Sequence, residues 1–305
     1  MKLKAIRITL SVLGMLTAFA VLANAQAAPA AQDIQIKTTK IAGNLYTLEG
    51  QGGMTGALVG PDGVLLVDTQ FAPMSEKILA AVKTLSSSPV RFVVNTHLHG
   101  DHTGGNENLG KTGAVIVARD KLRERLARPA PAANGTPGVP MPAAGLPLLT
   151  YDRAALTFHM NGEEVRAVPI PFAHTDGDTL VHFATSDVIM TGDFYRSAGY
   201  PNIDRNNGGS LQGMIDGLGF IVGLAGPNTK IIPGHGATVD RTAVTAHRDL
   251  ILALRDRVAP LVKQGKTVQE VTAAKLTAEF DSKVIAPGTT GDRFIGQLYA
   301  EIKGN

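Results

Sequence analysis

The sequence His97-Leu98-His99-Gly100-Asp101-His102 places three imidazoles and one carboxylate within six residues. Imidazole nitrogens and carboxylate oxygens are common ligands of zinc and of other divalent metals. Packing alone explains such a cluster poorly, because polar side chains that are buried together without a compensating partner lose solvation free energy. The stretch therefore predicts a metal site.

This histidine-rich stretch follows an apolar segment, 91–95, that is typical of a buried strand. It is followed by Gly104-Gly105, and glycine allows the backbone to turn sharply. We therefore expect the metal ligands on a loop at the carboxyl end of a strand. Sites in layered α/β proteins commonly occupy this position.

Three later segments repeat the order of an apolar run, a small residue and a metal-binding side chain. They end in His174, Asp193 and His235, which add two imidazoles and one carboxylate to the candidate ligands. The other histidines lack this context and are interpreted as structural or exposed, namely His159, His182 and His247.

In this order of motifs the chain resembles the metallo-β-lactamase superfamily of metal-dependent hydrolases. The resemblance rests on His-x-His-x-Asp-His at 97–102, on His174 and Asp193, and on Gly234-His235-Gly236. It covers the chain from about Ile36 to the last helices. It implies an α/β protein with the αββα architecture, in which two mixed β-sheets are flanked by helices.

The resemblance also implies two sets of metal ligands. The first metal would be bound by three imidazoles, those of His97, His99 and His174. The second would be bound by a mixed set consisting of Asp101, His102 and His235. Asp193 would bridge the two metals, as in the glyoxalase II-like branch of the superfamily.

The bridging position separates this chain from most β-lactamases of the family, which usually have cysteine or serine there. The chain contains no cysteine. One subclass of these β-lactamases shares the ligand at His102, so β-lactamase activity stays open.

The expected chemistry is hydrolysis by a metal-bound hydroxide. A bound zinc ion lowers the pKa of water to about 7 and polarises a carbonyl group. Asp101 is the candidate catalytic residue, because its carboxylate could orient this hydroxide. Two zinc ions per chain are expected, although iron and manganese also suit these ligands. The candidate acceptors for the outer N–H groups of the ligand histidines are Thr103, Thr175, Asp176 and Asp178, for which a turn or helix-cap role is the alternative.

Residues 1–25 have the features of a secretory signal peptide. Basic residues come first, an apolar segment spans 8–22, and Ala23-Asn24-Ala25 is typical of a cleavage site. We expect a periplasmic or secreted mature protein that begins at Gln26 and forms a single domain over 26–305. An uncleaved membrane anchor is the alternative.

The full chain has 29 basic and 26 acidic residues. The predicted signal peptide holds three of the basic residues (Lys2, Lys4 and Arg7) and no acidic one, so the mature chain has 26 of each kind. This balance argues against a nucleic-acid partner and favours a small-molecule substrate. The lack of cysteine excludes disulfides, so the core and the metals must stabilise the exported chain.

Hydrophobic periodicity predicts alternating strands and helices along the mature chain. Strands are predicted at 34–38, 45–48, 57–59, 64–67, 91–95, 114–118, 180–184, 187–191 and 229–232, with hairpin turns at Pro61-Asp62-Gly63 and at Asn161-Gly162 within 156–170. Helices are predicted at 74–85, 119–127, 211–224, 240–263, 267–277 and 292–303.

Three segments between these elements are candidates for contact with a substrate. The Pro-rich and Gly-rich segment 128–147 is either a flap near the metals or a solvated connector. The loop 50–55 overhangs the site in the family. Segment 195–210 follows Asp193 and offers polar side chains for a substrate, which are Arg196, Tyr200, Asn202, Asn206 and Asn207.

Three functions are consistent with the sequence. The first is an exported dinuclear zinc hydrolase of a cyclic amide or ester, with β-lactams and lactones as the leading substrates. The second is a thioesterase of the glyoxalase II type, in which the C-terminal helices would bind glutathione. That family is mainly intracellular, however, and these helices could simply pack. The third is an iron-dependent redox enzyme or a non-catalytic metal-binding protein of the same fold.

Overall fold

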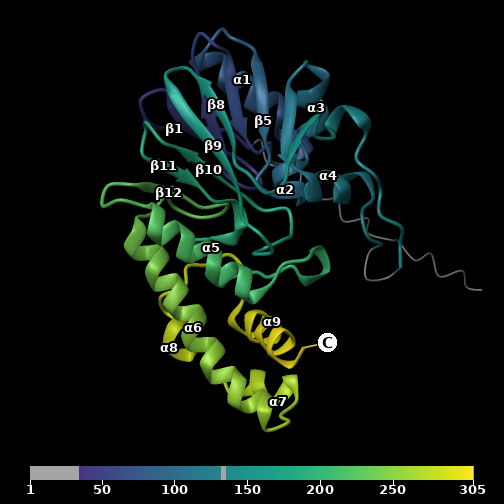
Figure 1. Ribbon diagram of the computed structural model, residues 1–305, viewed down its shortest axis with the longest axis vertical. Coiled ribbons are helices and arrows are strands. Elements are labelled where there is room, and N and C mark those ends of the chain that lie inside the picture. Colours follow the sequence, from purple (N-terminus) through teal and green to yellow (C-terminus); the bar gives the residue numbers. More distant parts are fainter. Residues whose placement is uncertain (1–33, 132–134, 305) are drawn as a thin grey trace, which may run out of the picture. The chain divides into compact units, whose positions relative to one another are not determined.

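Two mixed β-sheets pack face to face and are covered by helices on their outer faces (Figure 1). The structure is a computed structural model that describes residues 34–131 and 135–304. The predicted signal peptide, 1–25, lies outside the described residues. The arrangement confirms the predicted αββα architecture.

The first sheet has seven strands in sequence order, antiparallel from β1 to β4 and parallel from β4 to β7. Its strands are β1 (Lys37–Ala42), β2 (Leu45–Glu49), β3 (Thr55–Leu58), β4 (Val64–Val67), β5 (Val90–Val94), β6 (Val115–Arg119) and β7 (Leu149–Tyr151).

The second sheet has five strands in the order β12-β11-β10-β9-β8, and only the pair of β11 and β12 is parallel. Its strands are β8 (Leu156–Met160), β9 (Glu163–Pro169), β10 (Thr179–Phe183), β11 (Val188–Met190) and β12 (Lys230–Ile232). The predicted turn between β8 and β9 is confirmed. Asn161 and Gly162 both have positive φ, at 55° and 73°, as the tight turn of a hairpin requires.

Helices cover both outer faces of the sandwich. The helices that lie between or after the strands of the first sheet in the sequence are α1 (Ser75–Leu85), α2 (Gly100–Thr103), α3 (Asn106–Lys111) and α4 (Asp120–Ala127). The helices that lie between or after the strands of the second sheet in the sequence are α5 (Leu211–Leu224), α6 (Arg241–Lys263), α7 (Val268–Ala273), α8 (Ala278–Asp281) and α9 (Gly291–Lys303).

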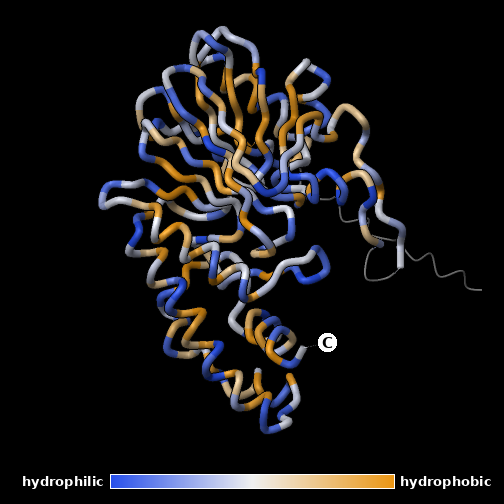
Figure 2. Tube along the Cα trace, in the orientation of Figure 1, coloured by the Kyte–Doolittle hydropathy of each residue, from blue (hydrophilic) through white to orange (hydrophobic). Residues whose placement is uncertain are grey.

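Strand β4 shows how the sequence builds these layers. All four of its residues are buried, and successive side chains of a strand point to opposite faces of the sheet. Leu65 and Val67 pack between the sheets, while Val64 and Leu66 pack in the layer under α1. Figure 2 shows the same pattern over the whole unit, since hydrophobic residues concentrate along the strands and the loops are mainly hydrophilic.

The segment after β5 differs from the predicted loop. Asp101 and His102 lie on the short helix α2, and α3 follows at once. Gly104 and Gly105 form the turn between these two helices, and their φ values of −59° and −80° are right-handed. The turn therefore does not use the left-handed region that glycine alone adopts readily. Their lack of a side chain matters for close contact instead, because a Cβ on Gly104 would lie 2.5 Å from the carbonyl oxygen of Gly100.

Other element boundaries also differ from the prediction. The first strand spans 37–42 instead of 34–38, and β7 was not predicted. Helix α7 ends at Ala273, and Lys275 just beyond it has a φ of 49°. A non-glycine residue in this left-handed region interrupts a helix, so the helix predicted over 267–277 is shorter.

The described part of segment 128–147 packs as a connector. Met141 donates its backbone N–H to Leu126 of α4, and both Met141 and Leu146 pack against the apolar cluster of Ala118 and Leu122. None of the helices in the described part of the chain combines the length and the apolar content that a membrane crossing requires.

The layer between the sheets should contribute much of the stability. Phe183 of β10 is fully buried there. We predict that Phe183→Ala lowers the free energy of unfolding by about 3–5 kcal/mol, because it removes apolar contacts and leaves a cavity. Thr157→Ala, at an exposed position of β8, should change it by about 0.5 kcal/mol or less. Urea unfolding of the zinc-loaded variants measures both, and equal effects would contradict this placement of the core.

Candidate metal centre

The strand ends of both sheets bring the predicted ligands to one edge of the sandwich. His97 follows β5, Asp193 follows β11, and His235 follows the parallel neighbour β12. His174 lies in the connection between β9 and β10. Because the carboxyl ends of neighbouring parallel strands meet at the same edge, ligands far apart in the sequence become neighbours.

The first predicted ligand set forms a compact group of three imidazoles. Ligand atoms of His97, His99 and His174 all lie within 4.8 Å of one another. The Nδ1 atom of His99 is 2.9 Å from Nε2 of His174. The Nε2 atom of His97 is buried and has no hydrogen-bond partner.

The second predicted set is also assembled. Asp101, His102 and His235 have ligand atoms within the same limit. The distance from His235 Nε2 is 3.0 Å to Asp101 Oδ2 and 3.4 Å to His102 Nε2.

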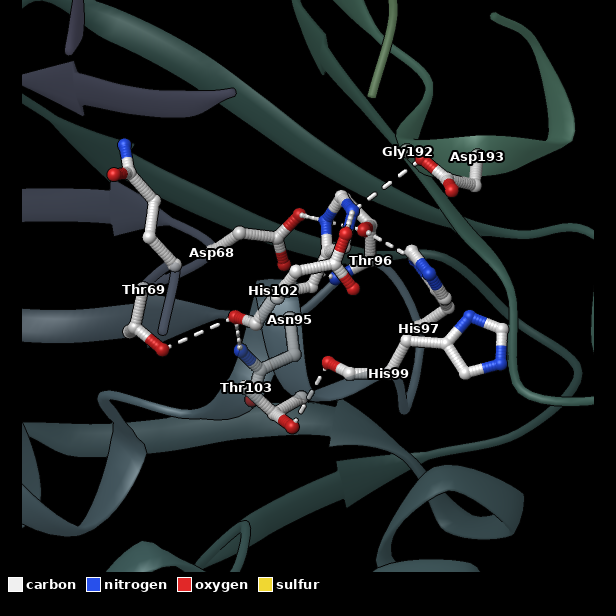
Figure 3. A network of polar contacts seen from close by, with 12 residues as sticks. Asp68, Thr69, Asn95, Thr96, His97, His99, His102, Thr103, Gly192 and Asp193 are labelled. Atoms are coloured by element: carbon white, nitrogen blue, oxygen red, sulfur yellow. Dashed lines mark hydrogen bonds and ion pairs between the residues drawn. The ribbon is translucent and has the colours of Figure 1, made fainter. Parts of the chain in front are cut away.

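Asp193 lies between the two sets. Its Oδ1 is 3.3 Å from His102 Nε2 and 3.4 Å from His235 Nε2, while its Oδ2 is 3.9 Å from His174 Nε2. The side chain is 5% exposed, and Oδ1 has no hydrogen-bond partner. The dashed contact between Asp193 and His102 is visible in Figure 3.

These contacts fit a pair of divalent metals. Buried polar atoms are normally hydrogen-bonded, yet His97 Nε2 and Asp193 Oδ1 accept or donate no hydrogen bond among the described residues. The nitrogens of His99 and His174 face each other, and a cation between them would accept both lone pairs. The donor set of imidazoles and carboxylates suits zinc.

The charges of the cluster favour the ligand forms of His97, His174 and Asp193. Burial, with repulsion from His102, lowers the pKa of His97 well below its usual range. Burial also lowers the pKa of His174 to about 4. Burial opposes ionisation of Asp193, but the nearby charge of His102 outweighs it and lowers the pKa of Asp193. Neutral imidazoles and ionised carboxylates are the forms that bind metal.

His102 differs, because burial lowers its pKa but the charges of Asp68 and Asp193 outweigh burial and raise the pKa well above its usual range. A metal bound at His102 would displace this proton.

The outer nitrogens of three ligand histidines are held by oxygen acceptors. His102 Nδ1 donates to Asp68 Oδ2 over 2.7 Å, as Figure 3 shows. His99 Nε2 donates to Asp204 Oδ2 over 2.7 Å. His174 Nδ1 donates to the carbonyl oxygen of Asn202 over 2.6 Å. Such partners fix the ring orientation and leave the other nitrogen free for a metal.

Sequence reasoning missed Asp68 and Asp204. Asp68 directly follows β4, so the pattern of a strand followed by a carboxylate, which found Asp193, could also have found it. Its φ is 63°, and Thr96 donates both its backbone N–H and its hydroxyl to the same carboxylate. Asp204 is the single carboxylate of segment 195–210.

The four acceptors predicted for the ligand histidines make other contacts. Thr103 donates to backbone carbonyls of the histidine-rich stretch, and Thr175 donates to Asp178. Asp178 accepts the backbone N–H groups of His174 and Thr175, and burial raises its pKa to about 7. Asp176 pairs with an arginine of α4. The alternative of a turn role therefore holds for Asp178.

The polar residues predicted in segment 195–210 have three different placements. Arg196 lies beside the site, with Nη1 3.6 Å from Asp193 Oδ2, and Asn206 lines a cavity beside His99. Tyr200 is buried, and its hydroxyl donates to Asp281. Asn202 and Asn207 support ligand histidines, directly or through Asp204.

The loop 50–55 lies over the second ligand set. Gly53 donates its N–H to the carbonyl of Asp101, and Met54 donates to that of Gly234. A Cβ on Gly53 would overlap the His102 ring, so glycine is required for this close approach.

Two cavities adjoin the ligands. One of about 520 Å³ lies beside His99, between segment 202–206 and α9. The other, of about 460 Å³, lies beside His235, between loop 50–54 and segment 285–288. Segment 128–147 contributes no described residue to either cavity.

An αββα sandwich with two converging histidine and carboxylate sets is characteristic of metal-dependent hydrolases. The family model of the metallo-beta-lactamase superfamily matches residues 50–256. This is more than half of the chain, and the chain belongs to this superfamily.

Individual curated relatives match only part of the chain, at low sequence identity. A hydroxyacylglutathione hydrolase of Rhodospirillum rubrum is 30% identical over 139 residues, which is 45% of this chain and 46% of that protein. This chain therefore spans about half the length of that curated relative.

Solved structures share the fold. A metallo-beta-lactamase from Pontibacter korlensis matches with a TM-score of 0.59 and 19% identity, over 72% of this chain and 99% of that one. An inverting sec-alkylsulfatase from Pseudomonas sp. matches with a TM-score of 0.68 and 18% identity, over 87% of this chain and 50% of that one.

The position of Asp193 leads to a prediction about metal content. After loading with zinc and removal of the excess, the wild-type protein should retain about two equivalents. Asp193→Ala should retain about one, because His97, His99 and His174 still form a complete set. Elemental analysis of the purified proteins measures this ratio. The exposed control Asp216→Ala should bind as the wild type does, and two equivalents retained by Asp193→Ala would contradict the bridging position.

Proposed function

We propose that this protein is an exported dinuclear zinc hydrolase that cleaves an acyl compound, with cyclic esters and amides such as lactones and β-lactams as the leading substrates. The observation that carries the proposal is the position of Asp193 between two complete ligand sets. A carboxylate in this position can hold two metals together at the short separation that two-metal hydrolysis uses.

Each of the two metals would be bound by one of the two ligand sets. His97, His99 and His174 would hold one metal, and the carboxylate-containing set would hold the other. Bound there, zinc lowers the pKa of water to about 7 and polarises the substrate carbonyl.

Exposure indicates where the substrate enters. Asp193 and the rings of His97, His102 and His174 are buried, whereas His99, Asp101 and His235 keep 27%, 25% and 22% of their side chains exposed. These three side chains form the accessible face of the centre. The two adjoining cavities open beside His99 and His235, so the two parts of a substrate can occupy opposite sides of the scissile bond.

Asp101 is the residue placed to handle a proton. Burial favours its neutral form, but the hydrogen bond with His235 and the charge of His102 lower the pKa of Asp101. The carboxylate is therefore ionised at neutral pH. It can accept a hydrogen bond from an attacking water and orient it toward the carbonyl carbon.

A thioester is the second candidate substrate. Two observations favour it, which are the similarity to a hydroxyacylglutathione hydrolase and the contribution of α9 to the cavity beside His99. C-terminal helices would then bind part of the substrate instead of only packing against α6.

A substrate panel tests the proposed reaction. We expect the zinc-loaded protein to hydrolyse at least one of a lactone, a β-lactam and a thioester. Chelation should reduce turnover by at least about 100-fold, because the ligands alone provide no activated water. Added zinc should restore it. Hydrolysis of none of the acyl compounds, or turnover that resists chelation, would contradict the proposal.

Export is tested on the protein from its native host. We expect the protein in an extracytoplasmic fraction with a mature N-terminus at or near Gln26. The reason is the basic start, apolar segment and small-residue site of 1–25. N-terminal sequencing decides the question, and Met1 on most of the protein would overturn the proposed export.

A further inference from the structure

Helix α4 is joined to the metal centre by an arginine outside the ligand sets. Arg125 forms a bidentate ion pair with Asp176, with Nε to Oδ1 and Nη2 to Oδ2 both at 2.7 Å. Asp176 is buried. The Nη1 atom of the same guanidinium donates to Asn207 Oδ1 over 3.1 Å. Bidentate pairs of this kind fix geometry as well as contributing energy.

The contacts continue from Asn207 to a ligand histidine. Asn207 donates its Nδ2 to Asp204 Oδ2 over 2.7 Å and its backbone N–H to Oδ1 over 3.2 Å. The Oδ2 atom accepts from His99 Nε2 over 2.7 Å. The other nitrogen of His99 is the one that faces His174. An unbroken series of hydrogen bonds therefore leads from Arg125 to a predicted metal ligand.

The backbone holds the same segment closely. Asp176 donates its N–H to the carbonyl of Asn207, and Asp204 donates to that of His174. Gly208 has a φ of 78°, and a Cβ there would lie 2.8 Å from the Asp176 side chain. The ion pair and the segment that carries Asp204 are thus fitted to each other.

We propose that Arg125 is a positioning residue for the first metal, which acts through Asn207 and Asp204 on the orientation of His99. Its guanidinium fixes Asn207, Asn207 fixes the Asp204 carboxylate, and Asp204 holds the Nε2–H of His99 so that Nδ1 stays available to the metal. The inference rests on the metal centre of the proposed function, but it requires no particular substrate.

A purely structural role makes a different prediction. If Arg125 only attached α4 to the segment after His174, its loss would lower stability and leave the metal affinity of the folded protein unchanged. Positioning predicts a selective loss at one of the two metals. Partners of metal-binding histidines typically contribute about 10–100-fold to affinity.

The experiment measures zinc affinity at both positions by chelator competition. The proteins are the wild type, Arg125→Ala, Asp204→Ala and the double variant. Arg125→Ala should lower the affinity for one of the two zinc ions by about 10-fold and change the affinity for the other by no more than about twofold. The double variant should be no more than about twofold weaker than Asp204→Ala alone, because residues that act through one another are not additive.

Two further variants keep the test decisive. Lys121→Ala removes an exposed cation of the same helix that pairs with Glu124, and it should bind both zinc ions as the wild type does. Asn207→Ala interrupts the series while the ion pair of Arg125 and Asp176 stays in place, so it should show the same selective loss even if Arg125→Ala does not fold.

Three results would overturn the inference. They are affinities in Asn207→Ala and folded Arg125→Ala within twofold of the wild type, an equal loss at both metals, and additive effects in the double variant. A wild type that binds no zinc would instead refute the proposed function itself, and the inference with it. Normal metal binding without hydrolysis of any substrate would leave the positioning role supported and refute only the reaction.

Discussion

The convergence of lone pairs at one edge of the sandwich is the constraint on which the site depends. Five imidazoles and two carboxylates meet there, and among the described residues the buried atoms His97 Nε2 and Asp193 Oδ1 have no hydrogen-bond partner. Buried polar atoms without partners are costly. A metal ion at the centre of the cluster would satisfy them, and metal binding would then be coupled to local stability.

The surrounding fold holds the candidate ligands in the positions that a metal would require. Parallel strand pairs in each sheet align their carboxyl ends, and glycines at Gly53 and Gly234 let neighbouring backbone approach the His102 ring and the Asp193 carboxylate. The outer nitrogens of the rings bind Asp68, Asp204 and a backbone carbonyl. The inner nitrogens of these rings then remain available to bind a metal, and the partly exposed side chains of the cluster remain accessible to a substrate.

The architecture and the seven candidate ligands could be predicted because each depends on a local pattern. Apolar runs such as those at β4 and β5 mark buried strands, and the ligands directly follow such runs. Among the supporting residues, Asp68 follows the same pattern directly after β4, but Asp204 could not be predicted in this way. Asp204 reaches His99 across 105 positions of sequence, and the short helix α2 is too brief to show a periodicity. The lysine with positive φ that follows α7 likewise has no signature in composition.

Anomalous X-ray diffraction from crystals of the zinc-loaded protein tests the central claim most directly. The account predicts two zinc peaks about 3.5–4 Å apart, with one carboxylate oxygen of Asp193 near each and the imidazoles divided three and two between them. A single peak, or two peaks with the Asp193 carboxylate turned away from one of them, would contradict it.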